Sequence, residues 1–512
     1  MSVLGHLEPK SVFGYFEDIC KIPHGSGNMD KISQFCVDFA KEHNLEYIVD
    51  DMKNVIIIKE ATEGYEEAAP IILQGHLDMV CEKRPDKEKD FLTEGIDVCT
   101  DGVNVWADGT TLGGDNGIAV AYGLALLSAK DLQHPRLEVV LTVDEETGLY
   151  GAEAIDMSML KGKKLINLDS EEEGIFTVGC AGGLTLACDI PMFTEEVEGE
   201  VYELKVTGLL GGHSGAEIHK GRGNSNVILG RVLLAIGQKI GLDIIKMEGG
   251  SKDNAIPRLS VAEVLISAED AEKFAALVKE QEALLKNELH ASDAGVALEV
   301  TAKGAGTAEV LDATSKVSAL HALNNIPNGI QAYSMDIEGL VETSLNMGIM
   351  TMDGESLKMS FAIRSSIESA KHYLTDRTML FVDMLGGSCE IKGDYPGWAY
   401  NPNSELRETF IKVYREMYGK EPVVEAIHAG LECGLFTKKI DGLDSISIGP
   451  NMQNVHTSEE SLEVGSVQRI SKSFCLSPNL KLIWLAIKSD TYPGSLLAKM
   501  FRTVSGATEL VI

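Results

Sequence analysis

Four short segments of the chain are apolar along almost their whole length, and they constrain its fold most strongly. These strand-like runs are NVIIIKE (54–60), PIILQG (70–75), RLEVVLTV (136–143) and KLINLD (164–169). A helix-like stretch (117–130) lies between the second and third runs, and the segments 9–22 and 29–43 show apolar residues near helical spacing. Nearly all-apolar strands that alternate with helices indicate an α/β sheet covered on both faces. Ligands of such sheets bind beyond the carboxyl ends of the strands.

The pattern of strand-like and helix-like segments changes after about residue 186. A strand-like segment (204–212) is followed by two predicted helices (224–240 and 268–289). A hairpin-like alternation (342–363) and a last predicted helix (368–385) come next. This pattern is typical of an inserted α+β domain, and YPGWAY (395–400) marks the return to the first domain. We therefore predict a first domain formed by residues 1–186 and 399–470, an inserted domain of residues 187–398 and a C-terminal tail of residues 471–512.

Charge and composition argue against several classes of protein. The 45 Lys and Arg residues against 78 Asp and Glu residues give a net charge of −33, which repels nucleic acid and anionic membranes. No run approaches the ~20 apolar residues of a membrane span, and the N-terminus lacks the pattern of a secretory signal. The nine cysteines are odd in number and form no CxxC pair, so we expect reduced, buried thiols in a cytoplasmic protein.

Polar clusters follow the apolar runs or lie in glycine-rich turns. They are His76 and Asp78 in GHLDMV, Asp115 in TTLGGDNG, Glu145 and Glu146 in VDEETG, Asp169 in NLDSEEEG, and His456 in NMQNVHTSEE. Strand side chains alternate with period two, so His76 and Asp78 face the same side. A metal-bound imidazole usually donates its other ring N–H to a carboxylate or carbonyl, a partner that Asp78 can supply.

The remaining clusters allow both a chemical and a structural interpretation. Glu145 and Glu146 can serve one site only where their strand ends, one as a ligand and the other to activate water. Asp115 lies among Gly113, Gly114 and Gly117, where it can bridge two metal ions or simply form a turn. In so acidic a chain each cluster alone is weak evidence, because acidic runs usually form solvated faces. Their joint occurrence after successive strands favours a metal hydrolase.

The chain closely resembles the bacterial aminoacyl-histidine dipeptidases in the ordered motifs GHLDMV, TTLGGDNG, TVDEETG, NLDSEEEG, GGHSG, NAIPR, ETSLN, YPGW and HAGLECGLF. These cytosolic enzymes belong to the two-zinc aminoacylase and carboxypeptidase G superfamily, and the resemblance runs from about residue 5 to about residue 468. It implies an α/β fold: a two-zinc exopeptidase catalytic domain with a mixed sheet flanked by helices, and an inserted α+β lid domain that forms a homodimer.

The resemblance also implies a set of zinc ligands. His76, Asp115 and Asp169 would hold one Zn²⁺, and Asp115, Glu146 and His456 the other; Mn²⁺ or Co²⁺ can substitute at such carboxylate-rich sites. Glu145 would be the general base on a metal-bridging water, and Asp78 would clamp His76. A cis peptide is implied between Asp115 and Asn116.

Substrate-binding residues are implied on the lid. His213 would stabilise the oxyanion, and Asn254 and Arg364 would bind the substrate carbonyl and its C-terminal carboxylate. His428 and Gly430 in HAGLECG would line the substrate side, although His428 and Glu432 also have the i, i+4 spacing of a helical zinc pair. From the residues alone, the default interpretation of His213 is a solvated histidine in a glycine-rich turn, and Arg364 would more often be a surface ion-pair partner. His24 is interpreted as structural.

The predicted function is hydrolysis of unblocked dipeptides, including Xaa-His and β-alanyl-histidine types, by a cytoplasmic homodimer. Two alternatives stay open: an aminoacylase or carboxypeptidase acting on N-acylated amino acids, and an inactive dimeric homologue. The tail of residues 471–512 is basic and apolar and departs from the family pattern, which ends in one amphipathic helix.

Overall fold

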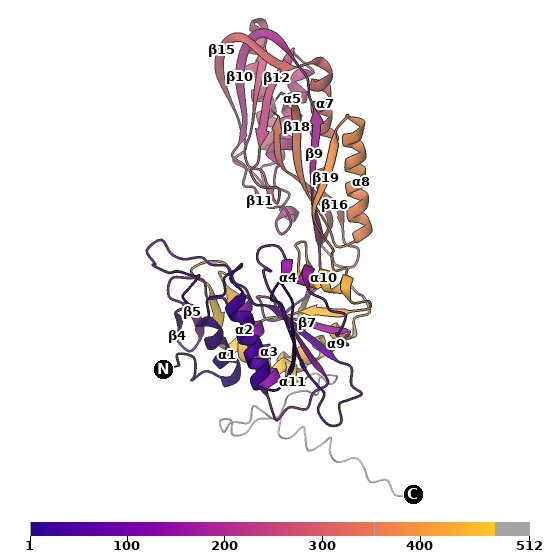
Figure 1. The fold of residues 1–512 in the computed structure, drawn as a ribbon. Helices are drawn as coiled ribbons and strands as arrows, with labels where there is room; N and C mark the ends of the chain where they lie inside the picture. The colour runs from indigo at the N-terminus through magenta and orange to yellow at the C-terminus, as the bar shows by residue number, and fades with distance from the viewer. Residues whose placement is uncertain (1, 353, 477–512) are drawn as a thin grey trace.

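The computed structural model describes residues 2–352 and 354–476, which build two large sheets (Figure 1). The first sheet has the strand order β1-β2-β6-β3-β7-β21-β8-β20 and mixes parallel with antiparallel neighbours. In that order its strands are Glu46–Val49, Val55–Lys59, Leu137–Thr142, Ile71–His76, Lys164–Asn167, Asp444–Ser447, Ile175–Cys180 and Val423–Ile427. The mixed sheet predicted for the catalytic domain is confirmed.

Both faces of the first sheet are covered, and alternate residues of β2, β3, β6 and β7 enter different cores. Leu73 and Val139 join the core formed with helices α1 (Lys10–Cys20) and α3 (Gly114–Ser128). Their neighbours Ile72 and Val140 join the core formed with α4 (Tyr150–Ala154) and α10 (Glu432–Lys439). The all-apolar runs therefore predicted the covered sheet correctly. Helices α2 (Asp30–Glu42), α9 (Glu405–Tyr418) and α11 (Val464–Leu476) complete this body.

Three neighbouring strands of the first sheet run parallel. Strand β3 pairs in parallel with β6 on one side and with β7 on the other. Their carboxyl ends therefore meet at one edge of the sheet, at residues 76, 142 and 167. The segments that follow these ends carry several of the predicted ligands.

The second sheet is formed by the middle of the chain and is antiparallel throughout. Its order is β15-β10-β14-β12-β17-β18-β9-β19, with β16 also paired to β17. In that order the strands are Ala297–Leu311, Thr194–Thr207, Ser260–Ile266, Leu242–Gly249, Val341–Met352, Ser356–Ser365, Gly182–Pro191, Ser388–Tyr395 and Gly329–Tyr333. Its core includes residues of α5 (Ser225–Gly237), α6 (Ala271–Glu288), α7 (Ala313–Asn325) and α8 (Glu368–Met384) (Figure 1).

The predicted elements of the inserted domain are mostly confirmed, with one correction. The helices expected at 224–240, 268–289 and 368–385 and the hairpin at 342–363 are all present. The strand expected at 204–212 ends instead at Thr207, because Gly208 and Gly211 adopt positive φ angles of 75° and 67°. The short strand β11 (Gly212–His213) then pairs with β13 (Ala255–Ile256). The domain boundaries themselves stay predictions; the second sheet spans residues 182–395.

Smaller features complete the fold. A four-stranded sheet has the order β22-β23-β5-β4, with strands Met452–Gln453, Ser461–Glu463, Asn104–Ala107 and Val98–Thr100. Short 3₁₀ helices span Ile218–Lys220 and Ala268–Asp270. No helix in the described ranges is long and apolar enough to cross a membrane. The predicted tail, residues 471–512, lies outside the described residues except for 471–476, which end α11.

The cysteines are only partly as predicted. Eight cysteines of the described ranges are free, and five of them are buried. Cys81 is exposed in the loop after β3, whereas Cys99 and Cys389 are half-buried. The expectation of uniformly buried thiols was therefore wrong for these three, because loops and edge strands leave one side of a residue open to solvent.

Candidate metal centre

The predicted ligands converge at the carboxyl edge of the three parallel strands. His76 is the last residue of β3, and Asp169 follows the end of β7 by two residues. Glu146 lies in the turn after β6, Asp115 lies at the start of α3, and His456 lies in the loop between β22 and β23. Segments from distant parts of the chain thus supply one ligand each.

Asp115 lies between the two histidines. Its Oδ1 is 3.1 Å from His76 Nε2, and its Oδ2 is 3.1 Å from His456 Nε2. His76 Nε2 is also 3.3 Å from Asp169 Oδ1, and His456 Nε2 is 2.8 Å from Glu146 Oε1. The structure therefore forms two triads that share one carboxylate, and within each triad the donor atoms lie within 4.8 Å of one another.

The donor set fits a pair of divalent cations. Each triad offers one imidazole nitrogen and two carboxylates, which are donors that zinc and similar ions accept. His76 is 1% exposed, and the ion pairs that its side chain makes in the described residues are all with carboxylates. So dense a set of acidic oxygens around the buried His76 and the exposed His456 is favourable when cations neutralise it.

The pKa shifts of the metal-free chain report this crowding. Hydrogen bonds that His456 donates to the Asp115 and Glu146 carboxylates raise its pKa to about 10. Burial raises the pKa of Asp169 to about 7. Burial acts against ionisation of Asp115 too, but its hydrogen bonds to His456 and His76 hold its pKa well below the usual range. The two triads thus hold protons that a bound cation must displace.

Glu145 lies beside the triads. Strand β6 ends at Thr142, and Asp144 turns the chain with a positive φ of 52°. Donor atoms of Glu145, Glu146 and His76 consequently lie within 4.8 Å of one another, although adjacent strand residues would face opposite sides. Burial raises the pKa of Glu145 well above its usual range. A carboxyl group in this position can exchange a proton with a molecule at the triads.

Asp78 contacts His76 through both its backbone and its side chain. The nearest partner of His76 Nδ1 is the backbone carbonyl of Asp78, at 3.0 Å, whereas the carboxylate Oδ1 lies at 3.5 Å. The carboxylate also accepts hydrogen bonds from the backbone N–H groups of Glu145 (3.1 Å) and Glu146 (3.3 Å) and from the hydroxyl of Ser26 (2.8 Å). Asp78 thus connects the β3 end to the Glu145 turn.

A second group lies on the inserted domain and its junction, and we call it the lid cluster: the predicted residues His213, Arg364, His428 and Gly430, together with Tyr395, which the sequence did not indicate. A Cβ atom at Gly215 would lie 2.4 Å from the His428 carbonyl oxygen, 3.0 Å from Arg364 Nε and 3.1 Å from His213 Cε1. Three predicted substrate residues therefore surround one glycine. Burial lowers the pKa of His428 to about 3, and the positive charge of Arg364 adds to this effect.

Tyr395 contacts one side of the Arg364 guanidinium. Its Nη1 donates to the Tyr395 hydroxyl at 2.9 Å, and its buried Nε has no hydrogen-bond partner among the described residues. Gly430 lies against the same tyrosine, because a Cβ there would be 2.9 Å from Tyr395 Cε2. Asn254 is exposed, and its carbonyl accepts from Ser214 N–H at 2.8 Å, next to His213. Within residues 2–352 and 354–476, no hydrogen bond or ion pair joins the lid cluster to the two triads.

Comparison with known proteins identifies the fold family. Residues 72–476 match the family described as peptidase family M20/M25/M40.

The chain belongs to this peptidase family.

Its relatives include the cytosol non-specific dipeptidase of Escherichia coli (strain K12), which is 38% identical over 91% of this chain and 96% of its own length. Among solved structures, the aminoacylhistidine dipeptidase of Vibrio alginolyticus is 37% identical, covers 92% of this chain and 96% of its own, and has a TM-score of 0.87. Aminopeptidase PepT of Bacillus cereus (14% identity, TM-score 0.54, 93% and 100% covered) shares the fold alone. These likenesses confirm the resemblance found in the motifs.

The supporting role of one buried polar residue in this peptidase-family member, Asn116, was missed in the sequence. Asn116 is fully buried; its Oδ1 accepts from the His76 backbone N–H at 3.2 Å, and its Nδ2 donates to the Leu168 carbonyl at 3.0 Å. It thereby ties three ligand-bearing segments together. The cis peptide expected between Asp115 and Asn116 is present.

Glu432 corrects the interpretation of HAGLECG as purely a substrate-side wall. Its Oε2 accepts from Gln74 Nε2 at 2.5 Å and from the Thr142 hydroxyl at 3.0 Å, in the interior of the first sheet. Helix α10 begins at Glu432, so His428 precedes the helix and the two do not form a helical zinc pair. Gln74, a polar residue in an otherwise apolar run, was the available signal.

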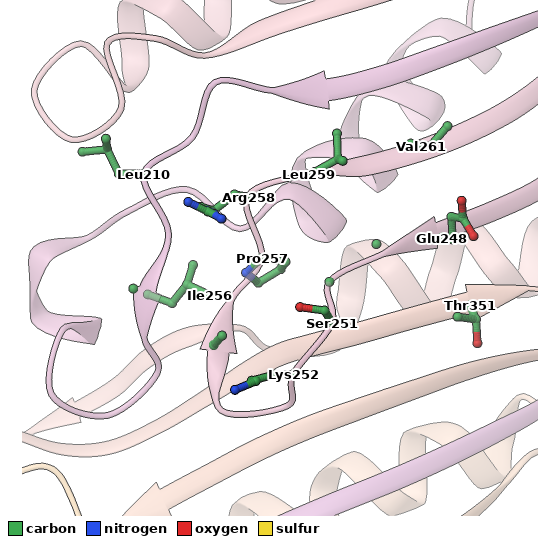
Figure 2. A pocket seen from close by; sticks show the side chains of 14 residues that line it. Leu210, Glu248, Ser251, Lys252, Ile256, Pro257, Arg258, Leu259, Val261 and Thr351 are labelled. Atoms are coloured by element: carbon green, nitrogen blue, oxygen red, sulfur yellow. The ribbon is translucent and has the colours of Figure 1, made fainter. Parts of the chain in front are cut away.

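A cavity of about 670 Å³ lies beside the β11–β13 pair (Figure 2). Its lining includes Gly212, Lys252, Ile256, Arg258 and Leu259. It lies close to His213 in the chain, but no member of the triads or of the lid cluster lines it. The cavity is therefore separate from the candidate catalytic residues.

Proposed function

We propose that the chain is a metal-dependent dipeptidase that hydrolyses unblocked dipeptides, including Xaa-His and β-alanyl-histidine types. The observation that carries this proposal is the Asp115 carboxylate, which turns one oxygen toward each histidine so that two triads share a ligand. The names of the Escherichia coli and Vibrio relatives support a dipeptide substrate. The proposal includes two Zn²⁺ ions per chain, replaceable by Mn²⁺ or Co²⁺, and a cytosolic location.

Divalent ions at the triads would supply Lewis-acid polarisation of the scissile carbonyl and of a water molecule, and their charge would favour ionised carboxylates nearby. Glu145 then takes the proton of the attacking water and returns it to the amine that leaves. Asp78 keeps the Glu145 turn in place through its hydrogen bonds to the two backbone N–H groups. The residues of the chain thus divide the work between holding ions and moving one proton.

The lid cluster would recognise the substrate. In the described part of the chain the buried Nε of Arg364 is unpaired and one Nη donates to Tyr395, so the guanidinium can bind a C-terminal carboxylate in a fixed orientation. His213 would donate to the oxyanion, and Asn254 beside it would bind the substrate carbonyl. His428 and Gly430 would form the adjoining wall. A guanidinium at a fixed place favours substrates with a free C-terminus, as a dipeptidase requires.

Glu145→Gln tests the proposal, with Glu153→Gln on the exposed face of α4 as the matched control. We expect Glu145→Gln to keep both ions and to lose roughly 10²–10⁴-fold in histidine release from β-alanyl-histidine, because the amide cannot accept a proton. The control should retain full activity. Wild-type protein that carries two zinc ions but releases no amino acid from dipeptides would refute the assignment. Equal turnover of N-acetylated and free dipeptides would instead indicate an aminoacylase or carboxypeptidase.

Association through the lid is part of the proposal and has its own test. Sedimentation of the full chain should give a dimer. Hybrid dimers of one Glu145→Gln chain and one His213→Ala chain then report which chain each lid cluster serves. Hybrid dimers regain activity if the lid cluster acts on the partner's triads, and they stay inactive if it acts on its own. A monomer with full dipeptidase activity would rule out the dimer.

A further inference from the structure

Glu460 is a buried carboxylate with an unusual set of partners. It is 2% exposed, and its Oε2 accepts from the backbone N–H groups of Leu112 (2.7 Å) and Gly113 (3.2 Å). Its Oε1 accepts from those of Gly114 (2.8 Å) and Asp115 (3.4 Å). Four consecutive N–H groups at the start of α3 thus point at one side chain from the other end of the chain.

These four N–H groups need an acceptor from elsewhere. The first N–H groups of a helix have no partner within it, and the α3 N-cap is Gly113, which has no side chain to provide one. A carboxylate at this position satisfies these donors, which lie before a kink of α3 where Asp115 and Asn116 are not helical. Glycine at 114 allows the close approach, since a Cβ there would lie 3.1 Å from Glu460 Oε1.

The same carboxylate belongs to the loop that carries the second histidine. Met452 pairs with Leu462 and Gln453 with Ser461, so residues 454–460 form the connection of the β22–β23 hairpin. Strand β23 also pairs with β5, which precedes the Asp115 segment. Through Glu460, the loop of residues 454–460 is therefore hydrogen-bonded to the segment of residues 112–115. His456 Nε2 lies 3.1 Å from Asp115 Oδ2 between these two loops, which we call the His456 loop and the Asp115 loop.

We propose that Glu460 is a positioning residue of the metal centre, which sets the affinity of the Asp115, Glu146 and His456 triad by fixing the Asp115 loop against the His456 loop. Glu460 is not itself a ligand, because both of its oxygens face backbone N–H groups. In the described part of the chain no Lys or Arg forms an ion pair with it, and its hydrogen-bond donors are the four backbone N–H groups. This inference rests on the metal-dependent function proposed above.

The test compares Glu460→Gln with Glu459→Gln. Glutamine keeps the volume of Glu460 but turns one NH₂ group toward two of the four N–H groups, whereas Glu459 is exposed and lies next in the chain. Zn²⁺ retention is measured by competition with a chromophoric chelator on the full chain, and the visible spectrum of the Co²⁺-loaded protein reports ligand geometry. We expect Glu460→Gln to bind one of the two ions ~10–100-fold more weakly, as other residues that orient ligands do. Glu459→Gln should match the wild type.

A double variant separates positioning from a general structural role. His456→Ala removes a ligand of the same triad, so Glu460→Gln should add little further loss of metal in its presence. Equal weakening of both ions, or retention of both within twofold by a folded Glu460→Gln protein, would overturn the inference. Should Glu460→Gln not fold, Glu460→Asp keeps the charge but shortens the reach, and it should show the same selective loss. Wild-type protein without bound metal would instead defeat the proposed function itself.

Discussion

Replacing Asn116 with alanine should loosen the candidate metal centre before any ion binds. The side chain is fully buried and bridges two segments that carry ligands. It accepts the backbone N–H of His76, the last residue of β3, and donates to the carbonyl of Leu168, the residue before Asp169. Alanine removes both bonds and leaves both backbone groups inside the protein without a partner.

The magnitude follows from these two groups. A buried donor or acceptor left unsatisfied costs roughly 1–3 kcal/mol, so the two together should lower the free energy of unfolding by about 2–6 kcal/mol. Asn116→Asp is a sharper variant of nearly equal size. One of its oxygens can still accept from His76 N–H, but the other faces the Leu168 carbonyl and adds negative charge beside Asp115 and Asp169. We expect this variant to be at least as destabilised without metal.

Urea unfolding of chelator-treated protein, followed by the fluorescence of the buried Trp398, gives the change in stability. Asn325→Ala, at the exposed end of α7, is the control and should fall within about 0.5 kcal/mol of the wild type, as surface substitutions usually do. A loss smaller than about 1 kcal/mol in Asn116→Ala would show that neither bond contributes as the structure indicates.

Three further predictions follow from contacts in the structure. In the metal-free chain Asp169 (pKa about 7) and His456 (pKa about 10) hold protons more tightly than their ordinary values, so the folded state binds more protons than the unfolded one. The stability of that chain should therefore fall as pH rises from about 5 to 9; calorimetric unfolding at several pH values checks this sign, and a rise in stability would contradict it. Zinc binding should release protons and weaken as pH falls, which calorimetric titration with zinc in two buffers checks. Tyr395→Phe should raise the KM for dipeptides roughly 2–10-fold with little change in kcat, because it frees Arg364; Tyr373→Phe, on an exposed side chain, is the control, and an unchanged KM would refute the role. Cys188 and Cys389 lie opposite each other on β9 and β19 with their Sγ atoms 2.8 Å apart, so diamide should oxidise them to a disulfide. Thiol titration should then count two fewer thiols in the wild type and in the control Cys81→Ser, but not in Cys389→Ser.

Much of the fold was predictable because its signals are local. The apolar runs of β2, β3, β6 and β7 predict strands covered on both faces, and the structure places alternate residues of each in two different cores. The strand ends then indicate where His76 and Asp169 must lie. The glycines around residue 210 were a local signal too, but their positive φ angles end β10 early where the alternation alone predicted a longer strand.

The residues that support the ligands were not predictable, because their partners are distant in the chain. Glu459 and Glu460 occupy the same acidic run, yet one is exposed and the other accepts four N–H groups about 345 residues away. No local pattern separates them, since the difference arises from how the β22–β23 hairpin pairs with β5. In a chain of net charge −33 a carboxylate becomes informative only when burial sets it apart from the many solvated ones. Mutating the two neighbours in parallel therefore tests whether burial, rather than residue type, assigns the role.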